Sequence, residues 1–336
     1  VLSLTGPVAA QSTDATRVVA TFSILGDIVK RIGRKHIALT TLVGPDGDTH
    51  VYKPTPAAAR AVSEAEVLIV NGLEFEGWLG RLIDASDFKG MRVVATKGIE
   101  PIASEKSEDH DEKADDDKHG HDKGDPDHGK KHAEAKHEAR HSDGHADDKH
   151  DDRHAGHGHG ALDPHAWQSL KNAVIYVDNI TAALAKADPE NAGTFYSNRA
   201  AYVAKIKALD TDIRENMARL PANRRTIITS HDAFQYFGRD YGLTFLAPQG
   251  LSTDSEASAQ DVARLIVQMR EKGISAVFIE NIADSRLLEQ IAKETGASIG
   301  GTLYPGALSG PGGSAPTYLD MIKHNYRTLV EALGIS

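Results

Sequence analysis

The stretch RVVATFSILGDIVKRIGRKHIALTTLVG, residues 17–44, decides the fold class. It begins with an apolar, β-branched run that predicts a strand, continues with apolar residues at helical spacing, and ends with a second strand-like run. A strand, a helix and a second strand in about 30 residues are typical of a parallel βαβ unit. The alternation continues through residues 66–72 and 92–98, with helices expected after Pro56 and around Trp78, so we predict a first α/β lobe.

A second series of the same kind begins near Arg225 and reaches the C-terminal helix expected from Thr317. Helical patterns lie between its predicted strands. We expect strands over residues 225–231, 243–250, 275–281 and 298–304.

Two helical patterns separate the series, over residues 170–186 and about 190–220. The second is bounded by prolines and would extend roughly 45 Å at 1.5 Å per residue. We therefore predict an α/β protein of two lobes with parallel sheets flanked by helices, joined by one long rigid helix. The expected bounds are 17–187 for the first lobe, 189–220 for the linking helix and 222–336 for the second lobe.

The composition limits the possible functions. The 336 residues contain no cysteine, so a metal ion would have to be held by nitrogen and oxygen ligands. The formal charge of -10 argues against nucleic-acid binding, which needs clustered Lys and Arg.

The first residues, VLSLTGPVAA at 1–10, resemble the end of a secretory leader. Small residues precede Gln11, and a polar stretch follows. We interpret residues 1–10 as a signal-peptide remnant and expect a periplasmic protein; the alternative is an ordinary disordered terminus. Elsewhere no apolar run reaches 18 residues, so no membrane span is predicted.

Residues 104–160 break the α/β pattern with Asp, Glu, Lys, Gly and His, and they carry twelve of the seventeen histidines. A segment with so few large apolar residues predicts disorder. Because imidazole binds zinc, three interpretations stay open: the segment gathers zinc and passes it to a metal site in the folded part of the chain, it caps such a site directly, or it only keeps the chain in solution. We favour gathering, through weak auxiliary sites at His119, His121, His154, His157 and His159.

Three of the remaining five histidines fall where open α/β folds bind ligands, at the carboxyl edge of a sheet. His50 follows the strand predicted at 36–44, His231 closes the one at 225–231, and His165 precedes a helix within DPHAW. Three neutral imidazoles suit zinc, at Zn–N distances of about 2.0–2.1 Å. We interpret His36 and His324 as packed or surface residues.

Four segments in the same order resemble the zinc- and manganese-binding solute-binding proteins of ABC importers, of the ZnuA type. They are GDTHVYKP at 47–54, DPHAW at 163–167, TSHDAF at 229–234 and TYLDMIKHN at 317–325. The resemblance covers residues 17–334 and implies two lobes joined by a long helix, with a metal ion held in the cleft by His50, His165 and His231. The His-rich insertion is similar to that of the family's zinc members.

Zinc is the first choice of metal because imidazole favours it, whereas manganese prefers oxygen-rich sites. The resemblance implies a carboxylate at the third position in manganese members, where this chain has His231. It also places an Asp ligand of many relatives at Gly306. The fourth coordination position is therefore open to water, a nearby carboxylate or a histidine of the insertion.

We predict an extracytoplasmic receptor that captures Zn²⁺ and delivers it to the permease of an ABC importer, without catalysing a reaction. A periplasmic zinc chaperone is a further candidate partner, and we expect a monomer. A zinc-dependent hydrolase is the competing class, for which Asp232 would be the nearest general base, although it is expected to cap a helix. A metal-binding adhesin or a manganese-binding receptor would also fit the sequence.

Overall fold

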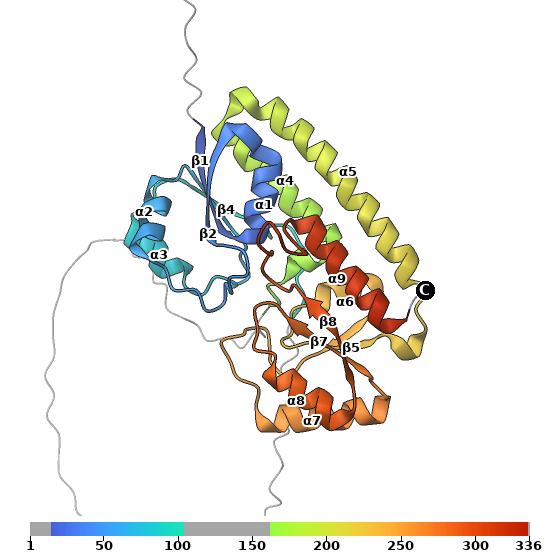
Figure 1. The fold of residues 1–336 in the computed structure, drawn as a ribbon. Helices are drawn as coiled ribbons and strands as arrows, with labels where there is room; N and C mark the ends of the chain where they lie inside the picture. Colours follow the sequence, from blue (N-terminus) through green and yellow to red (C-terminus); the bar gives the residue numbers. More distant parts are fainter. Residues whose placement is uncertain (1–14, 104–161, 335–336) are drawn as a thin grey trace, which may run out of the picture. The chain divides into compact units, whose positions relative to one another are not determined.

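The computed structural model describes residues 15–103 and 162–334. These residues belong to one compact unit that contains both series of strands and helices (Figure 1). The signal-peptide remnant expected at 1–10 and the auxiliary histidines expected within 104–160 lie outside the described residues.

The first sheet is parallel, with strand order β2-β1-β3-β4. The central strands β1 and β3 are apolar because their side chains are covered on both faces, and all four residues of β3 are buried. Its elements are β1 (Thr16–Phe22), α1 (Ser23–Gly33), β2 (Ile37–Val43), α2 (Pro56–Glu64), β3 (Val67–Val70), α3 (Leu79–Ser86) and β4 (Met91–Val94).

The second sheet repeats this arrangement, with parallel order β6-β5-β7-β8. The carboxyl ends of the central strands β5 and β7 are therefore neighbours, which brings the residues that follow them together. The elements are β5 (Thr226–Ile228), α6 (Gln235–Tyr241), β6 (Thr244–Leu246), α7 (Ala259–Lys272), β7 (Ala276–Glu280), α8 (Arg286–Thr295), β8 (Ser298–Leu303) and α9 (Tyr318–Leu333).

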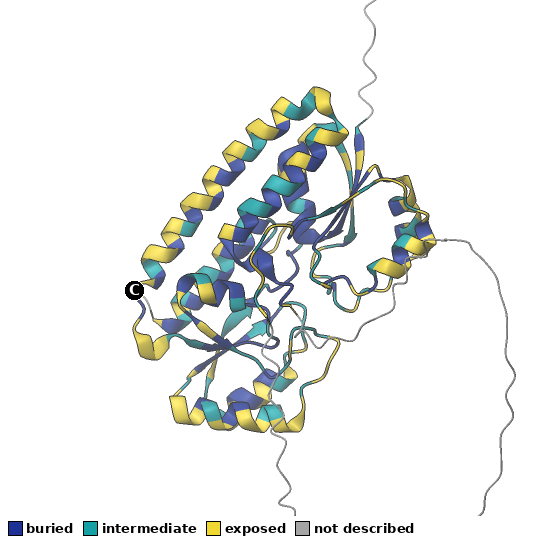
Figure 2. Ribbon diagram, turned by 180° about the vertical axis from the view of Figure 1, so that it is seen from behind, coloured by how far each residue is buried: buried dark blue, intermediate teal, exposed yellow. Residues whose placement is uncertain are grey.

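Two long helices, α4 (Leu170–Ala187) and α5 (Ala192–Met217), connect the two series. Figure 1 shows α5 running alongside α4 and ending beside the second lobe. Asn198 near its start donates to the carbonyl of Ile32 in α1, and Arg214 near its end donates to the carbonyl of Asp240 in α6. Exposed and buried positions alternate along α5 in Figure 2, because one of its sides packs on the core. The predicted long helix thus contacts elements of both lobes.

Trp167 is the centre of the packing between the lobes. Its fully buried ring contacts Phe22 and Phe75 of the first lobe, and its Nε1 donates to the carbonyl of Pro305 in the second. An aromatic side chain of this size contributes several kcal/mol when buried, about 3–5 kcal/mol by truncation to Ala. The lobes therefore share one packed junction directly beside His165.

Three local expectations were wrong in detail. The strand expected at 225–231 ends at Ile228, and His36 lies in a short 3-10 turn (Arg34–His36) rather than at the start of β2. Asp232 does not cap a helix: α6 begins at Gln235, and Asp232 Oδ1 instead accepts a hydrogen bond from Gln235 Nε2. The helix begins later than expected because the chain after Ile228 stays extended beside the segment that follows β6. His231 pairs with Gln249 there, and the backbone N–H of Asp232 donates to the carbonyl of Gly250.

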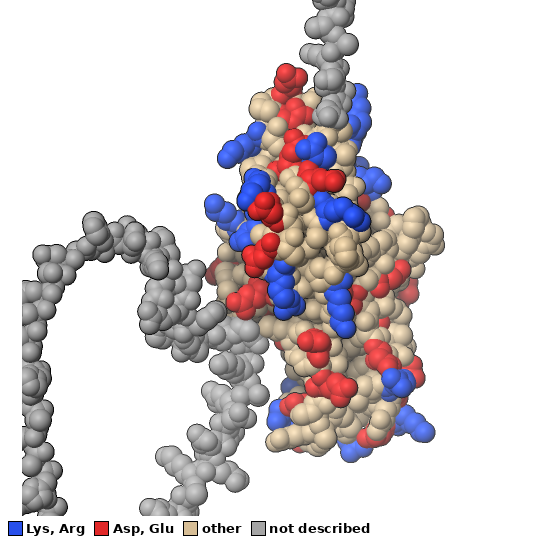
Figure 3. Space-filling view, turned by 90° about the vertical axis from the view of Figure 1, so that its left-hand side faces the viewer, with Lys and Arg blue, Asp and Glu red and all other residues tan. Residues whose placement is uncertain are grey.

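On the face drawn in Figure 3, Lys and Arg are interspersed with Asp and Glu rather than gathered in a basic patch. This face therefore has no cluster of positive charges that could bind a polyanion, in keeping with the negative net charge. In the part of the chain that the structure describes, no helix is long and apolar enough to cross a membrane.

Candidate metal centre

His165 lies between the two halves of the fold, at the start of the 3-10 turn (Ala166–Gln168) that leads into α4. Asp163 fixes it twice: Oδ1 accepts the backbone N–H of His165 at 2.9 Å and lies 2.8 Å from its Nδ1. The carbonyl of Pro164 accepts a hydrogen bond from Asn71, which follows β3. With Nδ1 donating to Asp163, the Nε2 lone pair is left to face the cleft.

His231 follows β5 and is fully buried. Glu280, the last residue of β7, lies beside it because β5 and β7 are neighbouring strands. Glu280 Oε2 lies 2.5 Å from His231 Nδ1, and Oε1 accepts the backbone N–H groups of Ser230 and His231. This carboxylate therefore fixes both the backbone and the ring of His231.

His50 belongs to the loop between β2 and α2. Its backbone N–H donates to Asp48 Oδ1, and the carbonyl of Thr49 accepts a hydrogen bond from Trp78 Nε1. Phe75 packs edge-on against its ring, with centroids 4.9 Å apart. His50 is partly exposed, whereas His165 and His231 are fully buried, so His50 lies on the solvent side of the cluster.

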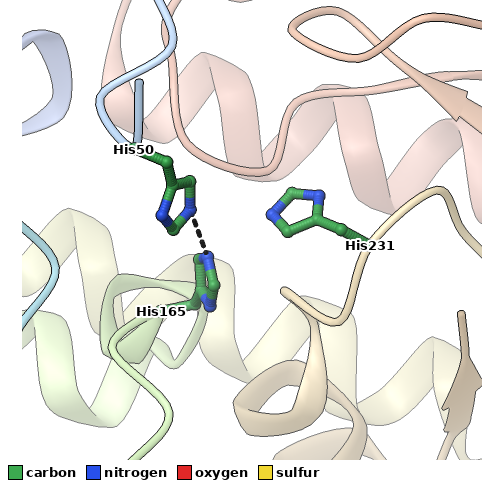
Figure 4. Close-up of side chains that lie close together, drawn as sticks. All are labelled: His50, His165 and His231. Carbon is green, nitrogen blue, oxygen red and sulfur yellow. Dashed lines mark hydrogen bonds between the residues drawn. The ribbon is translucent and has the colours of Figure 1, made fainter. Parts of the chain in front are cut away.

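The structure brings these three histidines to one point (Figure 4). One ligand nitrogen from each lies within 4.8 Å of the others, and the Nε2 atoms of His50 and His165 are 3.3 Å apart. Two nitrogens each about 2.05 Å from an ion at a tetrahedral angle would also be separated by about 3.3 Å. The spacing of His50 and His165 thus suits a shared zinc-sized ion, and a nitrogen of His231 lies close enough to complete the group.

Burial sets the protonation of the cluster. It lowers the pKa of His50 to about 2, with the two neighbouring imidazoles adding to the effect, and it holds the pKa of His165 well below its ordinary value. Burial also acts to lower the pKa of His231, but the charge and hydrogen bond of Glu280 outweigh it and raise that pKa. Two of the imidazoles are therefore neutral and ready to bind a cation.

One atom of the site lacks a partner that a metal would supply. His231 Nε2 is buried with no hydrogen-bond partner among the described residues, and a buried unpaired nitrogen costs about 1–3 kcal/mol. No carboxylate of the described residues joins the group of three ligand atoms. Gly306, where the resemblance places an Asp, offers no side-chain ligand, so the described residues supply three nitrogens.

The two carboxylates behind the histidines were missed as functional residues by sequence reasoning. Glu280 carries a signal that could have revealed it, because an acid ends the otherwise apolar strand AVFIE. Asp163 stands two residues before His165 in DPHAW, close enough for its carboxylate to reach the ring. His36 and His324 lie outside the cluster: His36 packs on Phe195, and His324 Nε2 bonds the carbonyl of Thr302.

Comparison with known proteins identifies the family and the fold of this chain. Residues 18–332 match the family described as "ZnuA: Zinc-uptake complex component A periplasmic". The chain belongs to the ZnuA family. Its sequence is 30% identical over 318 residues to the iron-binding protein YfeA of Yersinia pestis, covering 95% of this chain and 86% of YfeA. It is 31% identical to the manganese-binding lipoprotein MntA of Bacillus subtilis, and the match covers 94% of this chain and 89% of MntA.

Solved structures of periplasmic metal-binding proteins share the fold of this chain. A manganese-bound periplasmic metal-binding protein of Candidatus Liberibacter asiaticus superposes with a TM-score of 0.75 at 30% identity, covering 95% of this chain and 99% of that one. The periplasmic zinc-binding protein TroA of Treponema pallidum gives a TM-score of 0.75 at 26% identity, with the same coverage. The predicted two-lobed α/β fold is confirmed.

ZnuA-family proteins are extracytoplasmic substrate-binding components of ABC importers of metals. The chain is accordingly a periplasmic metal-binding receptor and not an enzyme, which removes the hydrolase alternative. Its partner is a membrane permease. The relatives differ in the metal that they are named for, so the family does not decide which ion this chain carries.

Proposed function

We propose that this chain is the Zn²⁺ receptor of its importer, holding the ion through His50, His165 and His231. The observation that carries the proposal is the convergence of three imidazole nitrogens within 4.8 Å, without a carboxylate of the described residues in the group. Nitrogen-rich sites favour zinc over manganese, which prefers oxygen ligands in near-octahedral geometry.

The surroundings support a divalent cation as cargo. Asp163 and Glu280 are buried behind two of the three ligands and together carry two formal negative charges when ionised. Two positive charges on the ion would balance them inside a low-dielectric site, where an unbalanced charge is costly. Burial raises the pKa of Asp163 to about 7, so a cation at this point would also draw the proton from that carboxyl.

A manganese- or iron-binding receptor is the competing assignment, and the names of MntA and YfeA favour it. The two assignments differ in the ligand set that they require. An oxygen-preferring ion would need carboxylates, but Asp163 and Glu280 contact the rings of His165 and His231, and no described carboxylate belongs to the group of ligand atoms.

Calorimetric titration of the full chain with Zn²⁺, Mn²⁺ and Fe²⁺ tests the proposal. We expect one tight zinc site, with Mn²⁺ bound at least about 100-fold more weakly in line with the order of divalent affinities. Alanine at His50, His165 or His231 should each remove the tight site, while His36→Ala and His324→Ala serve as matched controls and should keep it. Tight binding that survives all three cleft substitutions would disprove this assignment.

We further propose that residues 104–160 gather zinc weakly and pass it to the cleft, with His119, His121, His154, His157 and His159 as auxiliary ligands. The support is their composition, because clustered imidazoles bind zinc. Deleting residues 104–160 should remove weak sites and slow loading while the tight site persists. An unchanged stoichiometry and loading rate would reject this role.

A further inference from the structure

Asp48 connects a proposed ligand with the opposite lobe. Its Oδ1 accepts the backbone N–H of His50 at 2.9 Å. Its Oδ2 accepts the hydroxyl of Thr253, from the segment between β6 and α7, at 2.6 Å. Hydrogen bonds to a carboxylate are about twice as strong as neutral ones. A single side chain thus bridges the His50 loop of the first lobe and the second lobe.

Thr253 stands on a segment that is tied to His231. Gln249 forms a bridge with His231, and the backbone N–H of Asp232 donates to the carbonyl of Gly250. Displacement of Thr253 relative to Asp48 therefore changes the separation between the His50 loop and the segment that carries His231.

The start of the His50 loop has a separate anchor on the second lobe. The backbone N–H of Asp46 donates to the carbonyl of Leu308 at 2.8 Å, and its carboxylate accepts from Asn281 Nδ2 at 3.1 Å. Asp46 lies four positions before His50, whereas Asp48 bonds the backbone of His50 directly. With the loop start fixed in this way, Asp48 is the side chain that couples the ligand itself to the opposite lobe.

His50 is the most exposed of the three proposed ligands. His165 and His231 are fully buried and held by Asp163 and Glu280, whereas His50 is partly exposed and held through its backbone. Its ring contacts Phe75 rather than a carboxylate. Moving His50 away from the cluster therefore breaks fewer contacts than moving His165 or His231.

We propose that Asp48 is a positioning residue and that the bond between Thr253 and Asp48 sets the rate at which the metal ion is released. The inference rests on the proposed function, because it assumes that His50 is a ligand. The bond holds His50 against the other two ligands, and its rupture lets the loop carry His50 away from the ion. A partner that pulls the two lobes apart at this point would trigger release.

The test measures zinc dissociation from the full chain into an excess of chromogenic chelator. The slow phase that His231→Ala abolishes identifies the cleft ion. Thr253→Val, which removes the hydroxyl with little change of shape, should accelerate this phase roughly tenfold, the equivalent of about 1.4 kcal/mol.

Two matched variants separate positioning from general loosening of the segment. Thr253→Ser restores a hydroxyl and should return dissociation to nearly the wild-type rate. Ser252→Ala removes a hydroxyl that accepts from the backbone N–H of Asp254 within the same segment, and should leave dissociation unchanged. Two outcomes would overturn the inference while leaving the zinc site intact. Thr253→Val could leave the slow phase at its wild-type rate, or Ser252→Ala could accelerate that phase as much as Thr253→Val does. Absence of any phase that depends on His231 would instead overturn the proposed function.

Discussion

Glu280 holds His231 through three hydrogen bonds, two to backbone N–H groups and one, at 2.5 Å, to the ring Nδ1. This arrangement directs the second ring nitrogen of His231 into the cleft, where the described residues offer it no partner. A carboxylate behind a metal-binding imidazole fixes the tautomer and raises the basicity of the ligand.

Glu280→Gln should therefore weaken zinc binding about 10–100-fold, because the amide can still contact the ring but carries no charge. Calorimetry or competition with a chelator of known affinity measures the change. Gln290→Glu, a charge change on the exposed side of α8, is a control and should leave the affinity unchanged. An affinity in Glu280→Gln equal to that of the wild type would show that the carboxylate does not tune this ligand.

Glu76 predicts a pH dependence of stability that is independent of metal. Its fully buried carboxyl group accepts hydrogen bonds from Thr21 and from the backbone of Asn71 and Gly72, yet burial outweighs them and raises its pKa. The folded state therefore holds this proton more tightly than the unfolded state. The contribution to stability is fully present below the unfolded pKa of about 4.3 and is lost as pH rises through the raised folded pKa.

The free energy of unfolding of the metal-free wild type minus that of Glu76→Gln should accordingly be lower at pH 8 than at pH 4.5. The difference between the two proteins isolates Glu76, since the remaining titrating groups are shared. Urea unfolding at both pH values measures it. A wild-type-minus-variant value that increases toward high pH would contradict the sign of the pKa shift.

Gly238 in α6 makes a close approach that a side chain would prevent. A Cβ at this position would lie 2.6 Å from the backbone oxygen of Leu243 and 3.2 Å from the ring of Phe245. Gly238→Ala should thus reduce the free energy of unfolding by about 1–3 kcal/mol. Gly193→Ala is the matched control, because open space surrounds that position in α5, and it should be neutral or stabilising by up to about 1 kcal/mol. Equal effects of both substitutions on the urea midpoint would refute this explanation.

Gly306 provides a test of metal preference. A Cβ here meets only ordinary contacts, 3.7 Å from Trp167 and 3.8 Å from Ile282, so it fits without displacing a neighbour. The family resemblance places the Asp ligand of many relatives at this position. Gly306→Asp should raise the affinity for Mn²⁺ relative to Zn²⁺ because it adds an oxygen ligand. Gly306→Asn is the control of similar size, and parallel titrations that give the same Zn²⁺ to Mn²⁺ ratio as the wild type would exclude position 306 from the coordination sphere.

The fold could be predicted from the sequence because its signals are local. Runs such as VLIV at β3 are apolar on both faces, as parallel strands require, and α5 is bounded by prolines. The grouping of His50, His165 and His231 followed from topology, since each was expected at the carboxyl edge of a sheet. That they bind the metal stays a prediction.

The rest depends on contacts between residues far apart in the chain. Glu280 lies 49 positions from His231, and Thr253 lies 205 positions from Asp48, so neither pair leaves a pattern that spacing could reveal. The interpretation of Asp232 as a cap failed for a similar reason: pairing between His231 and Gln249 displaces the helix start to Gln235.

The central claim is that one zinc ion is shared by His50, His165 and His231. Anomalous diffraction at the zinc edge from crystals of the zinc-loaded chain tests it most directly. We predict a single strong peak about 2.0–2.1 Å from Nε2 of each of the three histidines. A peak bound by other residues, or none in this cleft from crystals that contain zinc, would contradict the account.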